Sequence, residues 1–364
     1  MTTGARREHR HRPLAGAIGV LTAVCVVLVV GPAPPASAHG PTPDATNYRS
    51  VVEGVVRPGG APAAVPGVTW DVLGGDGLLQ VRTTRDVEVV ISGYDDEPYL
   101  RVGPDGVFEN RNSPATYLNA DRYANTSVPT EIDPAAPPDW RRIDSGAQWR
   151  WHDHRIHWMA PTPPPAVRDQ PDRRQQILKW TVPFQVDGRR LEAHGELVYI
   201  PPPSVWPWLL GAILVLSLPV VGLIAAGADQ QRLQGVVVAF TVVVAGGGVA
   251  VALGDALATP AGVGANAWAI TQTVVPVGIA VALAWTVLRT AEPDDGAHPA
   301  STLVVSSVII AFSIGIARLS QLTASQVTNA LPDAVVRGAV AAGLTLVVPA
   351  VIVAMGQRVP GHDA

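Results

Sequence analysis

The chain has 364 residues, of which 48% are hydrophobic and only 15% are charged. This composition is too apolar for a simple soluble protein, and a formal net charge of −4 excludes the basic surface of a nucleic-acid-binding protein. The apolar excess lies before residue 31 and after residue 204, which is the pattern of an exported domain joined to a membrane domain.

Residues 1–38 have the pattern of a signal peptide. A leader rich in arginine precedes an uncharged apolar run from Leu14 to Val30, and Ala36-Ser37-Ala38 supplies the small residues of an A-x-A cleavage site. Cleavage after Ala38 makes His39 the first residue of the mature chain.

Two residue counts constrain the mature protein. The only cysteine, Cys25, lies inside the leader and leaves with it, so a metal site in the mature chain has no thiolate ligand and depends mainly on nitrogen and oxygen. Lys179 is the only lysine among 26 basic residues, which with abundant Ala, Val, Gly and Pro is typical of a high-GC bacterium such as an actinobacterium.

Residues 39–204 alternate short apolar runs with Gly, Pro, Asp and Asn, which predicts an extracytoplasmic, antiparallel all-β domain. We expect a sandwich of about seven strands, of cupredoxin or immunoglobulin type. Turns are predicted at 103–106 and 187–188, and a long loop at 111–144. The predicted strands cover 48–56, 68–72, 78–83, 87–91, 99–102, 107–110, 149–159, 177–186 and 190–199.

The segment Trp149 to Met159 holds three of the nine histidines and three of the ten tryptophans. If it is a strand, His152 and His154 project to one side, roughly 6 to 7 Å apart at the backbone, and both can converge on one ion. His157 needs a bulge or turn to join them. The alternative is that these imidazoles are hydrogen-bonded groups among stacked aromatic rings.

A histidine at a mature N-terminus offers two nitrogen ligands, the α-amine and ring Nδ1, which can chelate one metal ion. With a third nitrogen from a distant imidazole this set suits Cu(II), because copper stands at the top of the affinity order for such ligands. The amine binds after losing a proton, at a modest cost near neutral pH because its usual pKa is about 7.7 to 8.0. His39 is therefore a candidate copper ligand, although some residue must follow any cleavage site.

The His39-Gly40 terminus, the His-x-His of the Trp-rich segment 149–159 and the following membrane helices resemble the copper-binding subunit of particulate methane monooxygenase. They are also similar to CopC-type periplasmic copper carriers, which are sometimes fused to a CopD-type membrane domain. The resemblance covers only these two short motifs, and it implies a histidine brace at His39 with His152 and His154 as imidazole partners. The chain lacks a second β domain and the membrane histidines of CopD-type bundles, so copper binding is favoured over oxygenase chemistry.

Two further residues could contribute to a metal site. His194 in the last predicted strand is a possible fourth ligand, but a hydrogen-bonded strand residue is the commoner role. Met159 is a possible thioether ligand, although packing is expected. Asp153 could orient an imidazole, but strand alternation places it on the opposite face.

Residues 205–356 are predicted to form a membrane bundle of five helices, followed by a cytoplasmic tail at 357–364. Loop arginines favour an extracytoplasmic β domain. The few ionisable residues lie near the ends of the spans, so an ion-coupled transporter is not expected. The predicted spans are 208–226, 235–253, 268–288, 301–317 and 335–355, and the ionisable residues are Asp255, Arg318 and Arg337.

These patterns predict a multi-pass protein of the cytoplasmic membrane whose extracytoplasmic domain binds copper for handling or delivery, with the lipid bilayer and other envelope copper proteins as partners. The alternative is a metal-free structural or protein-interaction module that acts as a subunit of a membrane complex. A copper monooxygenase subunit is a third, more distant possibility. The sequence contains no nucleotide-binding loop and no hydrolase or metalloprotease motif, so neither nucleotide binding nor catalysis is predicted.

Overall fold

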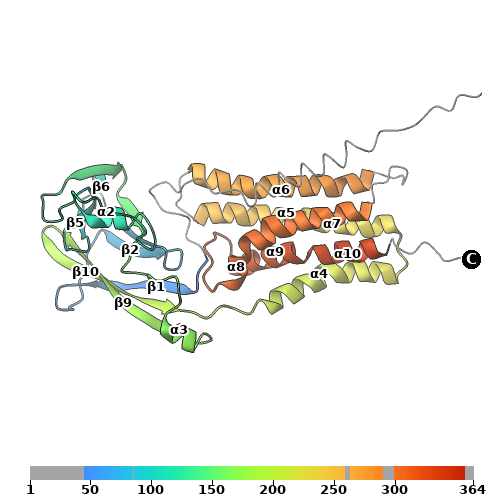
Figure 1. Ribbon diagram of the computed structural model, residues 1–364, viewed down its shortest axis with the longest axis horizontal. Helices are drawn as coiled ribbons and strands as arrows, with labels where there is room; N and C mark the ends of the chain where they lie inside the picture. The colour runs from blue at the N-terminus through green and yellow to red at the C-terminus, as the bar shows by residue number, and fades with distance from the viewer. Residues whose placement is uncertain (1–44, 85, 259–262, 290–298, 357–364) are drawn as a thin grey trace, which may run out of the picture. The chain divides into compact units, whose positions relative to one another are not determined.

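The computed structural model describes residues 45–84, 86–258, 263–289 and 299–356. The predicted leader, His39 and the predicted tail at 357–364 lie outside the described residues. Contacts between Cα atoms divide the chain into two compact units (Figure 1). Among the described residues, a β unit comprises 45–203 and 323–328, and a helical unit comprises 204–322 and 329–356.

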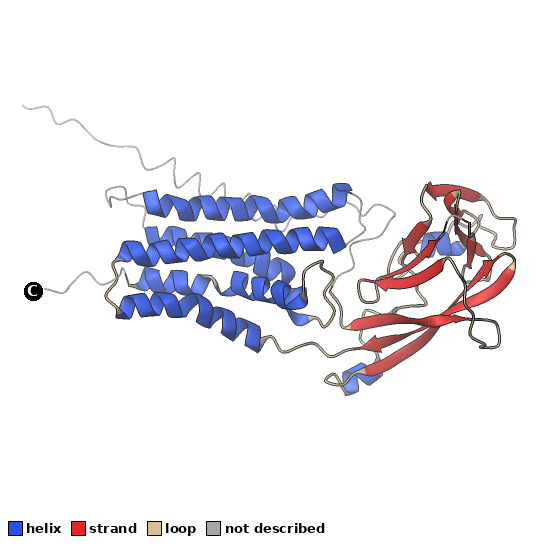
Figure 2. Cartoon of the chain, turned by 180° about the vertical axis from the view of Figure 1, so that it is seen from behind, coloured by secondary structure: helices blue, strands red, loops and turns tan. Residues whose placement is uncertain are grey.

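The β unit contains two antiparallel sheets (Figure 2). The larger has the strand order β1-β10-β9-β4-β5-β6-β7, and the smaller has the order β2-β3-β8. The strands are β1 (Tyr48–Val56), β2 (Val68–Leu73), β3 (Leu78–Thr83), β4 (Val89–Ser92), β5 (Pro98–Gly103), β6 (Gly106–Asn110), β7 (Trp140–Asp144), β8 (Gln148–Trp151), β9 (Gln175–Val186) and β10 (Arg189–Tyr199). The segment 323–328 joins this unit through a bridge between Gln326 and Thr46.

Both predicted hairpins are confirmed. β5 and β6 pair on either side of Pro104-Asp105, with Gly103 opposite Gly106. β9 and β10 are joined by Asp187-Gly188, whose φ angles of 52° and 72° are both positive. Two positive φ angles match the right-handed twist of the flanking strands, and glycine adopts such an angle without steric cost.

The predicted long loop at 111–144 is wrong at both ends. Helix α2 (Pro114–Leu118) begins after Ser113, whose Oγ accepts a hydrogen bond from the Ala115 N–H at 3.2 Å. A serine cap followed by proline in the first turn is a common helix start. The loop ends in β7, which pairs with β6. A second short helix, α3 (Pro165–Asp169), precedes β9.

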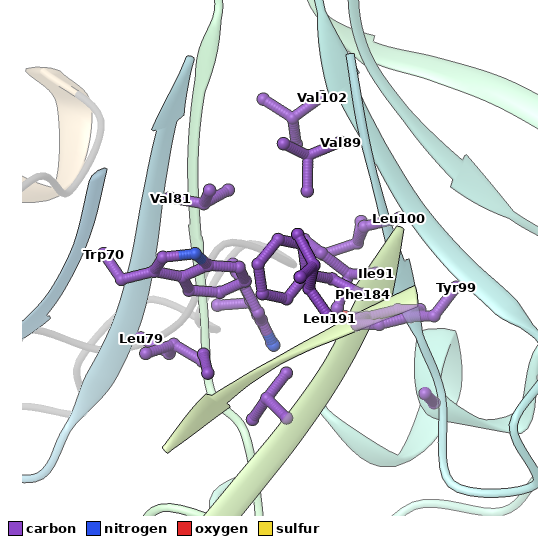
Figure 3. Packing of buried hydrophobic residues seen from close by; sticks show 14 of the residues in the cluster. Trp70, Leu79, Val81, Val89, Ile91, Tyr99, Leu100, Val102, Phe184 and Leu191 are labelled. Carbon is purple, nitrogen blue, oxygen red and sulfur yellow. The ribbon is translucent and has the colours of Figure 1, made fainter. Parts of the chain in front are cut away.

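The core of the β unit takes side chains from both sheets. Trp70 of the smaller sheet packs on Phe184 of the larger one, with ring centroids 5.0 Å apart (Figure 3). Around them lie Leu79 and Val81 of β3 and Ile91 of β4, all without solvent exposure. Each fully buried side chain of this size contributes about 1.5 to 3 kcal/mol, so this cluster is the main source of stability in the unit.

The helical unit confirms the five predicted apolar spans. Within the described residues, five helices are long and apolar enough to cross a membrane: Trp206–Ala225, Gln230–Ala258, Ala267–Arg289, Pro299–Thr323 and Asp333–Met355. They are built from α4 (Trp206–Ala225), α5 (Gln230–Ala258), α6 (Val263–Arg289), α7 (Pro299–Ile310), η2 (Ala311–Gly315), η3 (Ile316–Arg318), α8 (Leu319–Thr323), α9 (Asp333–Thr345) and α10 (Val347–Met355).

One polar network joins several of these helices. The Asp255 carboxylate of α5 accepts hydrogen bonds from Arg318 Nε at 3.1 Å, Gln321 Nε2 at 2.7 Å and Asn329 Nδ2 at 2.7 Å. Arg318 also donates to the Ser313 carbonyl at 3.1 Å, in the π-helical turn η2. Between α7 and α8 the backbone changes from α to π to 3-10 geometry, which interrupts the regular pattern of helical hydrogen bonds. The side chains of the network supply hydrogen bonds that a regular helix would not need.

Candidate metal site

The predicted strand at 149–159 is wrong beyond Trp151, where β8 ends. Asp153 Oδ1 accepts the Arg155 N–H at 3.1 Å, and the Asp153 carbonyl accepts the Ile156 N–H at 3.1 Å. An aspartate that bonds to the backbone two residues later competes with strand pairing and produces a turn. This turn therefore sets the directions of the three histidine side chains. They do not alternate between two faces as side chains along a strand do.

The turn is held by a buried ion pair. Asp153 is fully buried and accepts hydrogen bonds from Arg155 Nε at 2.8 Å and from Trp151 Nε1 at 2.9 Å. Burial alone would raise the pKa of the Asp153 carboxyl, but the charge and hydrogen bonds of Arg155 outweigh it and hold the pKa below its usual value. Asp153 thus anchors the turn through Arg155 and Trp151.

His154 is fixed by contacts from two distant segments. Its backbone N–H donates to the Tyr94 hydroxyl at 3.0 Å, and its ring stacks on Tyr94 with centroids 5.9 Å apart. Its Nε2 lies 2.9 Å from the Asp121 carbonyl. An imidazole that donates from one ring nitrogen to a backbone carbonyl presents the other as an acceptor, as metal-bound histidines do. His154 Nδ1 is then the nitrogen available for a ligand.

His152 and His157 are buried, with exposed fractions of 4% and 1%. Neither ring nitrogen of His152 has a hydrogen-bond partner, although the ring faces the backbone of Gly77. His157 Nδ1 lies 3.2 Å from the Trp158 carbonyl, and its Nε2 has no partner. Buried polar atoms are satisfied in the great majority of cases, so three such nitrogens so close in sequence are exceptional.

Both buried imidazoles are neutral at neutral pH. Burial, followed by the positive charge of Arg122, lowers the pKa of His152, and the same two causes lower the pKa of His157 to about 4. The neutral imidazole is the form that binds a metal ion. The ring centroids of His154 and His157 are 5.6 Å apart, so the turn brings His157 beside His154.

A cavity of about 520 Å³ adjoins His152. Its wall includes Asp76 and Arg122, which form an ion pair at 2.7 Å with Asp76 only 1% exposed. Burial raises the pKa of the Asp76 carboxyl, and Arg122 opposes this shift. Ala45, the first described residue, also lines this cavity. Asp76 and Arg122 were not singled out in the sequence, because only the fold brings them beside residue 152.

The other candidates lie apart from this cavity. His194 on β10 lies 2.9 Å from Glu192 through Nε2, which is the role of an ordinary strand residue. Met159 is half-buried. Across the ranges that the structure describes, which exclude His39, no three His, Cys, Asp or Glu side chains are arranged to hold a metal ion. The described histidines thus supply part of a ligand set at most.

Comparisons of the chain with family models, with curated proteins and with solved structures find no match. The site must therefore be interpreted from its own geometry.

Proposed function

We propose that this chain is a membrane-anchored, extracytoplasmic copper-binding protein that handles or delivers copper. In this proposal the signal peptide is cleaved after Ala38 and the β unit lies outside the cytoplasmic membrane. Its two sheets form a sandwich of cupredoxin or immunoglobulin type. Copper is held by the α-amine and ring of His39 together with imidazoles drawn from His152, His154 and His157, and the five apolar helices anchor the domain in the bilayer.

One observation carries the proposal: His152 and His157 are buried neutral imidazoles, and both ring nitrogens of His152 and the Nε2 of His157 lack partners. Leaving a buried polar atom unpaired costs about 1 to 3 kcal/mol, so a fold that retains several of them gains if a ligand completes their coordination. With no cysteine in the mature chain and three imidazoles close together, that ligand is best a metal that prefers nitrogen. Copper fits this preference, because its affinity for nitrogen ligands exceeds that of the other common divalent ions.

The length of chain between His39 and Ala45 is compatible with a contact between His39 and these imidazoles. Ala45 lines the cavity beside His152, and it lies six positions after His39 in the chain. An extended chain spans at most about 3.3 to 3.6 Å per residue, so His39 lies within roughly 20 Å of Ala45. Within this limit, a terminal histidine can approach the cavity and supply the α-amine and the ring nitrogen that the described residues lack.

The test is a Cu(II) titration of the purified full-length chain in detergent, after mass spectrometry has identified its first residue. We expect one copper per chain, and an electron paramagnetic resonance spectrum of nitrogen ligands in a tetragonal arrangement. A variant with one alanine inserted before His39 loses the chelate, and we expect its affinity to fall about tenfold or more. His152→Gln and His157→Gln should weaken binding by a similar factor.

His194→Gln is the matched control, because it removes an imidazole whose Nε2 is already paired with Glu192. Equal affinity of the wild type and the alanine-insertion variant would reject the brace but leave a site of internal histidines. Failure of the wild type to bind copper, or a first residue other than His39, would leave the metal-free interaction module as the better account.

A further inference from the structure

The β unit contains a second cavity, of about 420 Å³, which is separate from the ligand set proposed for copper except that His152 lies in the walls of both. Its walls come from β7, β8 and the region of α2. A volume of this size is in the range of cavities that hold small organic molecules.

The charged groups that line this cavity are mostly positive. Arg141, Arg142 and Arg150 contribute three guanidinium groups, and Glu109 contributes one carboxylate. Glu109 is already paired with Arg141. Burial lowers the pKa of Arg150 and the negative charge of Asp144 opposes this shift, so the guanidinium lies in partly desolvated surroundings near one carboxylate. A guanidinium group also matches the planar geometry of a carboxylate, because it can donate two parallel hydrogen bonds.

Aromatic rings provide the apolar part of the lining. Tyr117 and Trp149 are half-buried, and Tyr99 and Trp151 are buried, with the rings of the latter two packed edge to face at 6.5 Å. Such rings favour contact with a flat, apolar partner. A ligand with both a planar apolar body and an anionic end would match both parts of the lining.

A polar side chain that is not fully satisfied also lines the cavity. Asn119 is 7% exposed, and its Oδ1 accepts a hydrogen bond from the Tyr94 hydroxyl. Its Nδ2 faces the Tyr99 hydroxyl but reaches no acceptor at hydrogen-bond geometry. A buried donor in this state favours a ligand that accepts hydrogen bonds.

We propose that this cavity binds a small organic carboxylate with a planar, apolar body. The arginines of β7 and β8 receive the carboxylate, the Asn119 amide is an additional donor, and the aromatic rings contact the body of the ligand. The proposal does not depend on copper, because the arginines, Asn119 and the aromatic rings are not ligands in the proposed metal site. His152 lies in the wall of both cavities but has no role in carboxylate binding.

Benzoate is the probe, because it is the simplest molecule with both features. The full-length chain in a non-ionic detergent is titrated by calorimetry with a chelator present, and empty micelles serve as the blank. We expect saturable binding of one benzoate per chain in the millimolar range or tighter, as is usual for so small a ligand. Benzyl alcohol, which has the ring without the charge, and inorganic phosphate, which has charge without the ring, should each bind about tenfold or more weakly.

Two variants locate the site. Arg150→Gln removes a guanidinium group and Asn119→Asp replaces the amide donor by a negative charge while keeping an acceptor for Tyr94, and each should weaken benzoate binding about tenfold or more. Arg190→Gln is the control, because this exposed arginine pairs with Asp96 and does not line the cavity.

Near-ultraviolet circular dichroism checks that each variant is folded. If Asn119→Asp is misfolded, Arg150→Gln and Arg142→Gln decide the outcome. Absence of saturable benzoate binding overturns the proposal, and so do equal affinities for benzoate and phosphate or unchanged binding in the Arg150→Gln chain.

Discussion

Short hydroxyl side chains of the helical unit and polar side chains in the core of the β unit find their hydrogen-bond partners at different distances along the chain. In the helical unit, Thr241 donates to the carbonyl of Val237 at 2.9 Å, four residues earlier in the same helix. In the β unit, Trp180 donates to Ser50 Oγ at 2.7 Å, and 130 residues separate the two in the sequence. A helix offers its own carbonyls to a short hydroxyl side chain, whereas a sheet requires a partner from elsewhere in the chain.

This difference determines where unsatisfied groups can accumulate. Local partners come with the helix: Ser306, Ser313 and Thr345 all bond to carbonyls four residues earlier, although the buried hydroxyl of Ser217 in α4 has no partner. Distant partners depend on the fold, and the β unit leaves the imidazoles of His152 and His157 with unpartnered nitrogens. The candidate site therefore lies in the unit whose polar groups depend on long-range contacts.

The largest expected effect comes from breaking the buried ion pair that anchors the turn after β8. Asp153→Asn leaves the Arg155 guanidinium, which is only 17% exposed, without its buried carboxylate. Removing one partner of a buried ion pair costs about 3 to 5 kcal/mol, because the remaining charge stays desolvated. Urea unfolding of the full chain in detergent, followed by tryptophan fluorescence, measures this loss in the transition of the β unit.

Asp71→Asn is the matched control for that variant. Asp71 pairs with Arg82 in the same unit, but the two side chains are 44% and 50% exposed. Exposed pairs contribute less than about 1 kcal/mol, so the midpoint of unfolding should hardly move. Similar losses in the two variants would contradict the role assigned to the buried Asp153–Arg155 pair.

A second effect concerns pH. The pKa of His157 is lowered from 6.5 to about 4 by burial and by the charge of Arg122. The unfolded chain therefore gains a proton near pH 6.5 that the folded chain rejects until about pH 4. The neutral His157 ring therefore makes its full contribution to stability above pH 6.5. As the pH falls from 6.5 toward 4, the free energy of unfolding decreases by up to about 3 kcal/mol.

This dependence is measured as the free energy of unfolding between pH 7 and pH 4, with a chelator present to exclude metals. His157→Gln cannot gain a charge at this position, so its pH profile should be flatter than that of the wild type over this interval. Parallel profiles would show that His157 titrates normally in the folded chain. Carboxylates contribute equally to both profiles and cancel in the difference.

The smallest expected effect tests packing in the helical unit. A Cβ atom at Gly248 of α5 would overlap the side chain of Ile314, whereas one at Gly246 would meet nothing within 4 Å. Gly248→Ala should therefore destabilise the bundle by about 1 to 3 kcal/mol through overpacking. Gly246→Ala should be neutral or stabilising by up to about 1 kcal/mol, since alanine favours a helix.

Thermal unfolding of the two variants in the same detergent makes this comparison, with far-ultraviolet circular dichroism as the readout. The sequence marks Gly246 to Gly248 as a group of small residues, and only the structure separates their roles. Equal behaviour of the two variants would mean that α5 and η2 do not pack closely at Gly248.

The predictable parts of the fold depend on short stretches of chain. The hairpin at Asp187-Gly188 follows from two residues that tolerate positive φ between apolar strands. The predicted strand at 149–159 is wrong beyond Trp151, because the Asp153 side chain accepts the Arg155 N–H and turns the chain. A pattern with a period of two residues does not contain that information. β7 was missed because its pairing with β6 depends on a partner strand 30 residues away, and its own composition is weakly strand-like.

The sequence by itself determined the five apolar spans and most of the strands, because span length, alternation and turn chemistry act over about twenty residues or fewer. It also marked His152, His154 and His157 as an unusual group. Only the tertiary structure decided which imidazole nitrogens are occupied, and it placed Asp76 and Arg122 beside one of them. Those outcomes depend on contacts between residues far apart in the chain, whose geometry exists only after the sheets and the core have formed.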